Sequence, residues 1–363
     1  MQLDIRLTFT RGVPGSLVLP VFSSVEGSGK LRHERQEGHF DEELTSFLDE
    51  INHSGAPGEA ASLPRPTRKP RRIFLVGVGE GDPSGWRAFG AAVTRSAAKE
   101  TSVTVEVPAD VSGDCLRALI EGLRMAAYHY REVPLPEGRA PKLRRVNLDG
   151  PTDAEALEAG TVTAEVTLLA RDWVNTHSAR KSPQWLAAQM ERAAGSTAGI
   201  KTRIRDTEEL TREGFGGILA VGSGSSRPPR LVEMTWAPRG AKRHIVLVGK
   251  GITFDTGGIS IKPASGMLLM RKDMGGAAAV IGALIGAARL KLPIAVTALA
   301  PLAENSVGAS SFRPGDIVRH YGGKTSEILN TDAEGRVVLA DALAYAVRRL
   351  RPDVLIDLAT LTG

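Results

Sequence analysis

Apolar runs alternate with segments of helical periodicity through the amino-terminal part of the chain. Apolar and β-branched runs predict strands, and apolar residues spaced three and four apart predict helices. The predicted strands cover 16–22, 73–78 and 102–107, and the predicted helices cover 84–99 and 116–130. Because strands and helices alternate, we predict a parallel or mixed sheet in a first α/β domain.

The alternation continues with stronger apolar character in the second half of the chain. The predicted strands cover 230–236, 244–249, 294–300 and 354–359, and the predicted helices cover 274–290 and 336–350. Helix-start signals occur at Thr152 with Glu155, at Ser182 with Pro183, and at Asp206 with Glu209. Near-continuous apolar strands indicate a sheet that helices cover on both faces.

A segment rich in proline and charge, 132–146, is typical of a linker and indicates a domain boundary near residue 150. The length of 363 residues also exceeds the size of one average core. We therefore predict an α/β protein of two domains, 1–150 and 151–363, each a mixed sheet flanked by helices.

Composition narrows the class of protein without indicating a function. Apolar residues make up 42% of the chain and charged residues 24%, as in ordinary globular proteins. Cys115 is the only cysteine, which excludes an intramolecular disulfide and fits a reducing, cytoplasmic setting. The amino terminus lacks a signal-peptide core, and the apolar stretch 274–288 is too short to span a membrane.

The net charge is +5, and part of the excess lies in 64–72, where five of nine residues are Arg or Lys. Such a run is typical of a solvated linker, although it also suits binding to nucleic acid. A non-catalytic scaffold or nucleic-acid-binding protein is therefore the alternative to an enzyme. A nucleotide-binding enzyme is disfavoured, because Asp82 stands where the third glycine of a dinucleotide-binding loop belongs.

Two polar stretches, 250–273 and 330–336, interrupt the most apolar part of the sequence. They bring four acidic residues into loops beside buried strands: Asp255, Asp273, Asp332 and Glu334. Crowded carboxylates raise one another's pKa values unless cations are present, so we predict a pair of divalent metal ions. Mg²⁺ and Mn²⁺ prefer oxygen ligands, and Zn²⁺ also accepts them. No HExxH or cysteine-pair zinc motif is present.

Basic residues accompany these carboxylates. Lys250 and Lys262 are candidates for two roles, a deprotonated nitrogen ligand and an ammonium that stabilises developing negative charge, and their spacing leaves the assignment open. Arg336 offers a planar fork for a small oxyanion. Structural explanations also exist: a turn at Asp255, a helix cap at Asp273 and a first-turn helix acid at Glu334.

Several segments together resemble the leucyl aminopeptidase family of dinuclear metallopeptidases, the cytosolic, hexameric kind. The matching segments are VGKGITFDTGG, SIKP, MRKDMGGAA, NTDAEGRVVLADAL, ARDWVNTHS, AVGSGSSRPPRLVEM, AENSVG, RPGD and DLATLTG. They occur in the family's order from about residue 170 to the end, and the first domain matches only loosely. His177 replaces the family's usual proline, and family members continue beyond the carboxyl end of this chain, so we expect an incomplete catalytic domain.

The resemblance implies two metal ions, Mn²⁺ or Zn²⁺, bridged by Asp255 and Glu334. It implies that Asp332 completes one metal site and that Lys250 and Asp273 complete the other. A metal-activated water would then hydrolyse the bond after the amino-terminal residue.

The resemblance also assigns the residues around the metals. Lys262 would stay protonated and polarise the scissile carbonyl, and Arg336 would hold a bicarbonate ion that acts as general base. Met270 would line the pocket for the first side chain, and Thr360 and Leu361 would line the substrate. Peptides with a free amino terminus and a leucine-like first residue are the implied substrates, and a homo-hexamer is the implied assembly.

Overall fold

A computed structural model describes residues 3–8, 14–23, 29–31, 38–133, 140–150 and 153–361. The chain divides into two compact units, Met1–Glu165 (unit 1) and Val166–Gly363 (unit 2). Each unit is a mixed sheet flanked by helices, which confirms the predicted fold class. The predicted boundary near residue 150 precedes helix α4 (Ala154–Asn175), and the two units divide within this helix.

The sheet of unit 1 has the strand order β1-β7-β6-β2-β5-β4, and β3 pairs with β2. Its strands are β1 (Asp4–Thr8), β2 (Ser16–Ser23), β3 (Gly29–Leu31), β4 (Ala60–Pro64), β5 (Arg72–Gly79), β6 (Ser102–Glu106) and β7 (Arg145–Asp149). The pairs from β1 to β5 are parallel, whereas β3 and β4 pair antiparallel with their neighbours.

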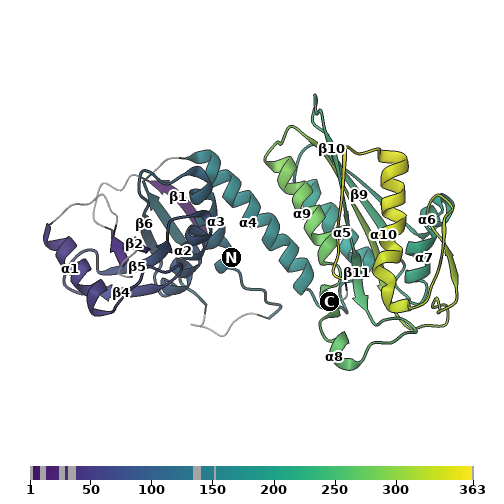
Figure 1. The fold of residues 1–363 in the computed structure, drawn as a ribbon, viewed down its shortest axis with the longest axis horizontal. Coiled ribbons are helices and arrows are strands. Elements are labelled where there is room, and N and C mark those ends of the chain that lie inside the picture. Colours follow the sequence, from purple (N-terminus) through teal and green to yellow (C-terminus); the bar gives the residue numbers. More distant parts are fainter. Residues whose placement is uncertain are drawn as a thin grey trace. The chain divides into compact units, whose positions relative to one another are not determined.

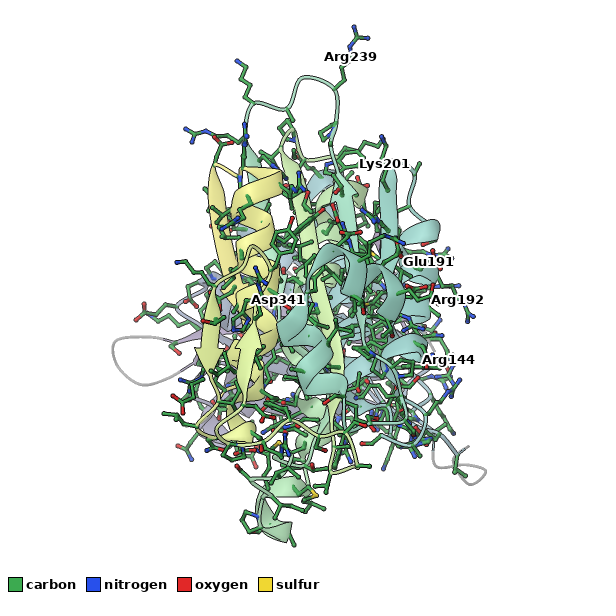
Figure 2. The ribbon with its side chains drawn as sticks, turned by 90° about the vertical axis from the view of Figure 1, so that its right-hand side faces the viewer. Arg144, Glu191, Arg192, Lys201, Arg239 and Asp341 are labelled. Carbon is green, nitrogen blue, oxygen red and sulfur yellow. The ribbon has the colours of Figure 1, made fainter. Side chains whose placement is uncertain are left out.

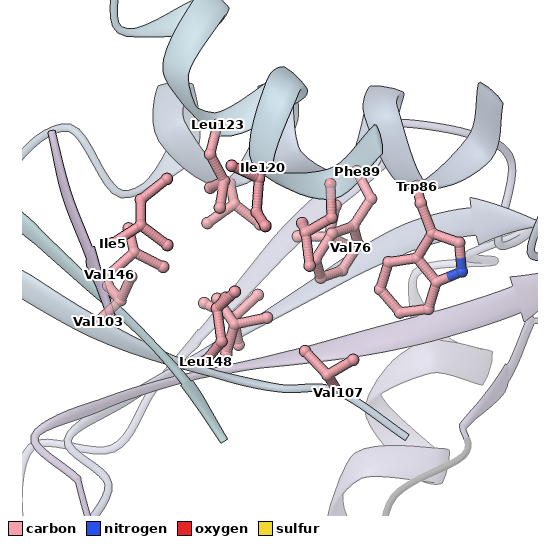
Figure 3. Close-up of a cluster of buried hydrophobic side chains, with 14 of the residues drawn as sticks. Ile5, Val76, Trp86, Phe89, Val103, Val107, Ile120, Leu123, Val146 and Leu148 are labelled. Carbon is pink, nitrogen blue, oxygen red and sulfur yellow. The ribbon is translucent and has the colours of Figure 1, made fainter. Parts of the chain in front are cut away.

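Helices cover both faces of this sheet. On one face, α2 (Pro83–Ser96) and α3 (Gly113–Ala126) place Trp86, Phe89 and Ile120 over the strands (Figure 3). On the other face, α1 (Gly38–Glu50) packs Leu44 and Leu48 against β2 and β5. Successive strand side chains point to opposite faces, so β2 contributes to both clusters.

The predicted strands of unit 1 are confirmed as β2, β5 and β6, and the predicted helices as α2 and α3. Elements β1, β3, β4, β7 and α1 were not predicted. The expected linker 132–146 includes the start of β7. This strand was missed because polar residues alternate with apolar ones in RVNLD, so no apolar run marks it.

The basic segment 64–72 connects β4 to β5 and is only partly solvated. The Arg65 side chain is buried, with its guanidinium 3.1 Å from the Glu43 carboxylate, and Arg68 lies 3.8 Å from the same carboxylate. Arg72 lies 3.3 Å from Glu100. The interpretation as a solvated linker is therefore wrong at Arg65, and Glu43 and Glu100 offset part of the segment's positive charge.

The main sheet of unit 2 has the strand order β15-β10-β12-β9-β8, and β11 pairs with β12. Its strands are β8 (Ile200–Arg205), β9 (Arg230–Trp236), β10 (His244–Gly249), β11 (Gly251–Asp255), β12 (Ala295–Asn305) and β15 (Val354–Leu358). Strands β10, β11, β12 and β15 pair in parallel, whereas β9 runs antiparallel to β12 and β8.

Helices α5 (Pro183–Gly195) and α9 (Gly275–Arg289) lie with the end of α4 on one face of this sheet. Helices α6 (Thr207–Glu213), α7 (Gly216–Gly222) and α10 (Glu334–Tyr345) lie on the other. Figure 1 shows α9 and α10 on opposite sides of the strands. Neighbouring residues of β12, Ala298 and Leu299, enter different clusters, as the pleat requires.

Short elements complete unit 2. They are α8 (Ala264–Met267), η1 (Met270–Lys272), β13 (Ile317–Arg319), β14 (Thr325–Glu327), η2 (Thr331–Ala333) and η3 (Ala346–Leu350). The exposed β9–β10 connection carries Arg239 at its tip, at the end of unit 2 opposite α8 (Figures 1 and 2). In the described part of the chain, no helix combines the length and apolar character of a membrane span.

The four predicted strands of unit 2 are confirmed as β9, β10, β12 and β15, with β12 longer than predicted. The predicted helix 336–350 begins two residues earlier, at Glu334, and changes to a π-helix at Ala346. The acidic residues expected in loops are also placed differently, because Asp255 ends a strand and Glu334 begins a helix.

Candidate metal centre

Parallel strands of unit 2 bring polar residues to one edge of the sheet. Lys250 directly follows β10, Asp255 ends β11, and Asn305 ends β12. Thr360 follows β15, whose Leu358 carbonyl accepts a hydrogen bond from the Lys250 amide at 2.9 Å. The carboxyl ends of parallel strands are the usual place for a site in an α/β sheet.

The Lys250 ammonium lies between two acidic side chains. Its Nζ lies 2.9 Å from each carboxylate oxygen of Asp273 and 2.8 Å from Glu334 Oε1. It also donates to the Thr360 carbonyl at 2.7 Å, and the Thr360 hydroxyl donates to Asp273 Oδ1 at 2.7 Å. Lys250, Asp273 and Glu334 are all buried, so these interactions take place away from water.

Lys262 faces the other two acidic residues. Its Nζ lies 3.0 Å from Asp255 Oδ2 and forms an ion pair with Asp332. Asp255 is buried, whereas the side chains of Lys262 and Asp332 are 14% and 23% exposed. The cluster is therefore closed around Lys250 and partly exposed to solvent near Lys262.

Neutral side chains connect the two acidic stretches. Asn305 Nδ2 donates to Asp255 Oδ1 at 2.8 Å and to the Thr331 carbonyl at 3.0 Å. The Thr331 hydroxyl donates to the Gly257 carbonyl at 2.6 Å and accepts from the Ser260 amide at 2.8 Å. Asn305 and Thr331 are fully buried. Two segments distant in sequence are thus held together by hydrogen bonds that carry no net charge.

The donor set fits a divalent metal ion. Asp255, Asp273 and Glu334 each offer one carboxylate oxygen, and these oxygens lie within 4.8 Å of one another. Glu334 Oε2 is buried and accepts no hydrogen bond from any described residue. Asp273 Oδ2 and Asp332 Oδ1 lie at ion-pair distance from lysines, but neither accepts a well-directed hydrogen bond from the described residues. Buried oxygens without donors are groups that a cation would satisfy.

The protonation equilibria show the same excess of negative charge. Burial, and then the nearby Asp255 carboxylate, raises the pKa of Glu334 to about 7. Burial also raises the pKa of Asp273. Burial opposes the charge of each lysine, yet Glu334 and Asp273 raise the pKa of Lys250, and Asp332 and Asp255 raise that of Lys262. Four carboxyl groups share two ammonium groups, so ionised carboxylates would outnumber the positive charges by two.

Roles in turns and helix caps explain the acidic residues only in part. Asp255 Oδ1 does accept from the Gly257 amide at 2.8 Å, as in a turn, but Oδ2 faces Lys262. Asp273 makes no side-chain cap on α9, whose first turn carries no side-chain hydrogen bond. Glu334 begins α10, and its carboxylate contacts Lys250. Capping and turn formation alone therefore do not explain the cluster.

The remaining predicted site residues lie around this cluster with fewer contacts. Arg336 is exposed in the first turn of α10, and it forms no ion pair with the described residues. Met270 is half-buried in η1, which leads into Asp273, and Leu361 is 62% exposed. Thr360 contacts Lys250 and Asp273 directly.

Two family models match the chain. The catalytic domain of the cytosol aminopeptidase family matches residues 168–363, and the amino-terminal domain of the same family matches residues 18–133. The first match covers more than half of the chain. The chain belongs to the cytosol aminopeptidase family. This membership assigns it to the aminopeptidases and confirms the resemblance found in the sequence.

Members of the family resemble the chain over most of its length. The probable cytosol aminopeptidase of Corynebacterium diphtheriae is 42% identical over 362 residues, which cover 96% of this chain and 70% of that protein. Its counterpart from Corynebacterium glutamicum is 42% identical over 327 residues, covering 89% of this chain and 65% of that protein. The chain thus spans about two thirds of the length of these relatives.

Solved structures agree with this family fold. The bottromycin maturation enzyme BotP, solved in complex with Mn, is 34% identical with a TM-score of 0.81 and covers 96% of this chain and 73% of that chain. The cytosol aminopeptidase from Coxiella burnetii is 30% identical with a TM-score of 0.79, covering 99% of this chain and 73% of that chain.

The neutral hydrogen-bonding residues of the candidate metal centre were not predicted from the sequence. Asn305, Thr331 and Ser260 are neutral, so the search for charge clusters passed over them. A usable signal existed, because Asn305 lies in AENSVG, one of the segments that carry the family resemblance. An uncharged side chain at the end of an apolar strand is therefore a further guide to such a site.

Without metal, this centre should make stability depend on pH. The pKa of Glu334 rises from 4.5 to about 7 on folding, so the folded chain keeps a proton that the unfolded chain releases between these values. Stability should therefore fall as the pH rises from about 5 to about 7, by at most about 3 kcal/mol, and then level off. Urea unfolding in EDTA of wild type and Glu334→Gln measures this difference. A wild type that gains stability over this range relative to the variant would contradict the burial argument.

Proposed function

We propose that this protein is a metal-dependent aminopeptidase that uses two divalent cations, Mn²⁺ or Zn²⁺, to release the amino-terminal residue of peptides. The observation that carries the proposal is the buried cluster of Asp255, Asp273 and Glu334. One carboxylate oxygen from each lies within 4.8 Å of the others, and Glu334 Oε2 accepts no hydrogen bond from the described residues. The Mn complex of BotP favours manganese. Zinc is supported only by the chemistry of the ligands.

The proposed ligand sets are those that the family resemblance implies. Asp255 and Glu334 would bridge the two cations, Asp332 would complete one site, and Lys250 with Asp273 would complete the other. Without metal, Lys250 is held as an ammonium by Asp273 and Glu334, so it would have to release its proton to bind a cation through nitrogen. Bound cations would lower the pKa of a water molecule and polarise the scissile carbonyl.

Lys262 and Arg336 would assist the cations in the reaction. Lys262 sits at the open side of the centre, and its neighbours Asp332 and Asp255 keep its pKa raised, so it is an ammonium at neutral pH. That ammonium would donate to the oxygen on which negative charge develops. Arg336 is exposed and not paired with the described carboxylates, and it would hold a bicarbonate ion as general base.

Apolar residues that neighbour Asp273 and Thr360 in the sequence support a leucine-like first residue in the substrate. Met270 precedes Asp273 by one turn of η1, and the exposed Leu361 follows Thr360. Met270 would line the pocket for the first side chain of the peptide, and Thr360 and Leu361 would line the substrate. The free amine of the peptide would bind a cation. A homo-hexamer, a cytoplasmic location and the alternative of a nucleic-acid-binding scaffold stay predictions.

Metal removal tests the proposal. Protein dialysed against EDTA should lose hydrolysis of leucine amide, and added Mn²⁺ or Zn²⁺ should restore it. N-acetyl-leucine amide should not be hydrolysed, because its blocked amine is a poor metal ligand. Isothermal titration with Mn²⁺ distinguishes two ways in which the proposal could fail. Binding without hydrolysis would support the metal site and refute peptidase activity of this chain, and no binding would refute the site itself.

A further inference from the structure

Lys181 is a fully buried lysine outside the proposed ligand set. It lies between α4 and α5, and its side chain has 0% relative exposure. Lysine is almost never buried to this degree unless partners satisfy its ammonium. The groups around Lys181 must therefore compensate for the loss of water around its ammonium.

Three backbone carbonyls accept hydrogen bonds from the Lys181 ammonium. Two of them, Trp173 O at 2.8 Å and Val174 O at 3.0 Å, belong to the last turn of α4. Carbonyls at a helix end lack amide partners within the helix, and the negative end of the helix dipole favours a cation. Lys181 therefore completes the carboxyl terminus of α4.

The third acceptor lies in a different segment. Lys181 Nζ donates at 2.6 Å to the carbonyl of Arg271, which is 90 residues away in the sequence and belongs to η1. This turn leads directly into Asp273, whose amide donates to the Met270 carbonyl at 3.2 Å. One ammonium thus joins α4 to the turn that carries both a proposed metal ligand and a proposed substrate contact.

Among the residues that the structure describes, no carboxylate forms an ion pair with Lys181. Burial lowers the pKa of Lys181 to about 7, and the positive charge of Arg271 acts in the same direction. An ammonium in this position is stabilised by its three carbonyl partners, and its three N–H donors match their number. Replacement by an apolar side chain would leave the Arg271 carbonyl without this donor.

We propose that Lys181 is a positioning residue for the metal centre, which holds η1 against the end of α4 and so fixes the Asp273 carboxylate in place to bind metal. The inference rests on the proposed role of Asp273 as a ligand. Partners that orient a metal ligand typically change metal affinity by about 10–100-fold when they are removed.

Lys181→Met leaves an unbranched side chain only one atom shorter than lysine and removes all three N–H donors. Lys272→Met, an exposed lysine of the same turn, is the matched control for the loss of charge. For Lys181→Met we expect the Kd for Mn²⁺ to rise about tenfold or more. Hydrogen exchange of metal-free protein should accelerate across 270–276, and Lys272→Met should leave both quantities near wild type.

The outcomes separate this inference from the proposed function. Failure of the wild type to bind Mn²⁺ would refute the function, whereas the exchange measurement still tests the contact with η1. Unchanged exchange across 270–276, or faster exchange only at the end of α4, would overturn the positioning role. If Lys181→Met does not fold, Lys181→Gln can be used, because it keeps two donors. It should show smaller increases in the Kd for Mn²⁺ and in hydrogen exchange across 270–276. Unfolding of both variants would make Lys181 a determinant of the whole unit and would also overturn the proposal.

Discussion

Asp255→Asn is expected to lower leucine amide hydrolysis with saturating Mn²⁺ by about a thousandfold or more, equivalent to about 4 kcal/mol of transition-state stabilisation. Asp255 Oδ2 faces Lys262 while Oδ1 already accepts from Asn305 and Gly257. Asparagine can keep the two accepted hydrogen bonds, so the fold should survive. Its neutral amide cannot bridge two cations, so the second metal should bind weakly.

Asp357→Asn is the matched control for Asp255→Asn, because Asp357 is an exposed aspartate of β15 in the same sheet. It should retain wild-type rates and Mn²⁺ affinity. Initial rates and Mn²⁺ titrations on all three proteins give the comparison. Equal turnover by Asp255→Asn and wild type would remove Asp255 from the bridging position and with it the proposed metal arrangement.

Lys262→Met is expected to reduce kcat by about 100- to 1,000-fold, the usual effect of losing one donor to a developing oxyanion. Mn²⁺ binding should persist and even tighten, because Asp255 and Asp332 lose the ammonium that partly offsets their charge. A defect in catalysis together with tighter metal binding is a combination that misfolding does not produce.

Lys201→Met provides the control for Lys262→Met, since Lys201 is exposed on β8 (Figure 2). Steady-state kinetics and Mn²⁺ titration together decide the outcome. Loss of Mn²⁺ binding in Lys262→Met would make this lysine part of the metal site, and an unchanged kcat would exclude it from the reaction.

The central strands of unit 2 could be predicted because they are apolar and largely buried. The run IVLVG in β10 and most of β12 stand out in the sequence, and the edge strand β15 is also apolar although it is largely exposed. Strands β1 and β7 pair with each other through Asp4 and Arg145, far apart in the chain, and each alternates charged with apolar residues. Such strands form because they pair with distant segments, and the local sequence pattern does not reveal this pairing.

The charged part of the candidate site could be predicted for a different reason. Lys250 follows a buried strand, and Asp273 and Glu334 flank the starts of buried helices, so ionisable groups there conflict with their surroundings. The neutral residues Asn305 and Thr331 produce no such conflict. Lys181 was also missed, because only the structure shows that its side chain is buried against distant carbonyls.

The bonds of Asn305 and Thr331 have a consequence for how a cation would be captured. They unite the segment around Gly257 with the segment around Asp332 through neutral groups, independently of any ion. Folding alone therefore brings these loops together, and metal binding does not carry the entropic cost of ordering them. The centre is preorganised. Metal uptake should therefore be limited by dehydration of the ion and release of the lysine proton, with little rearrangement of the backbone.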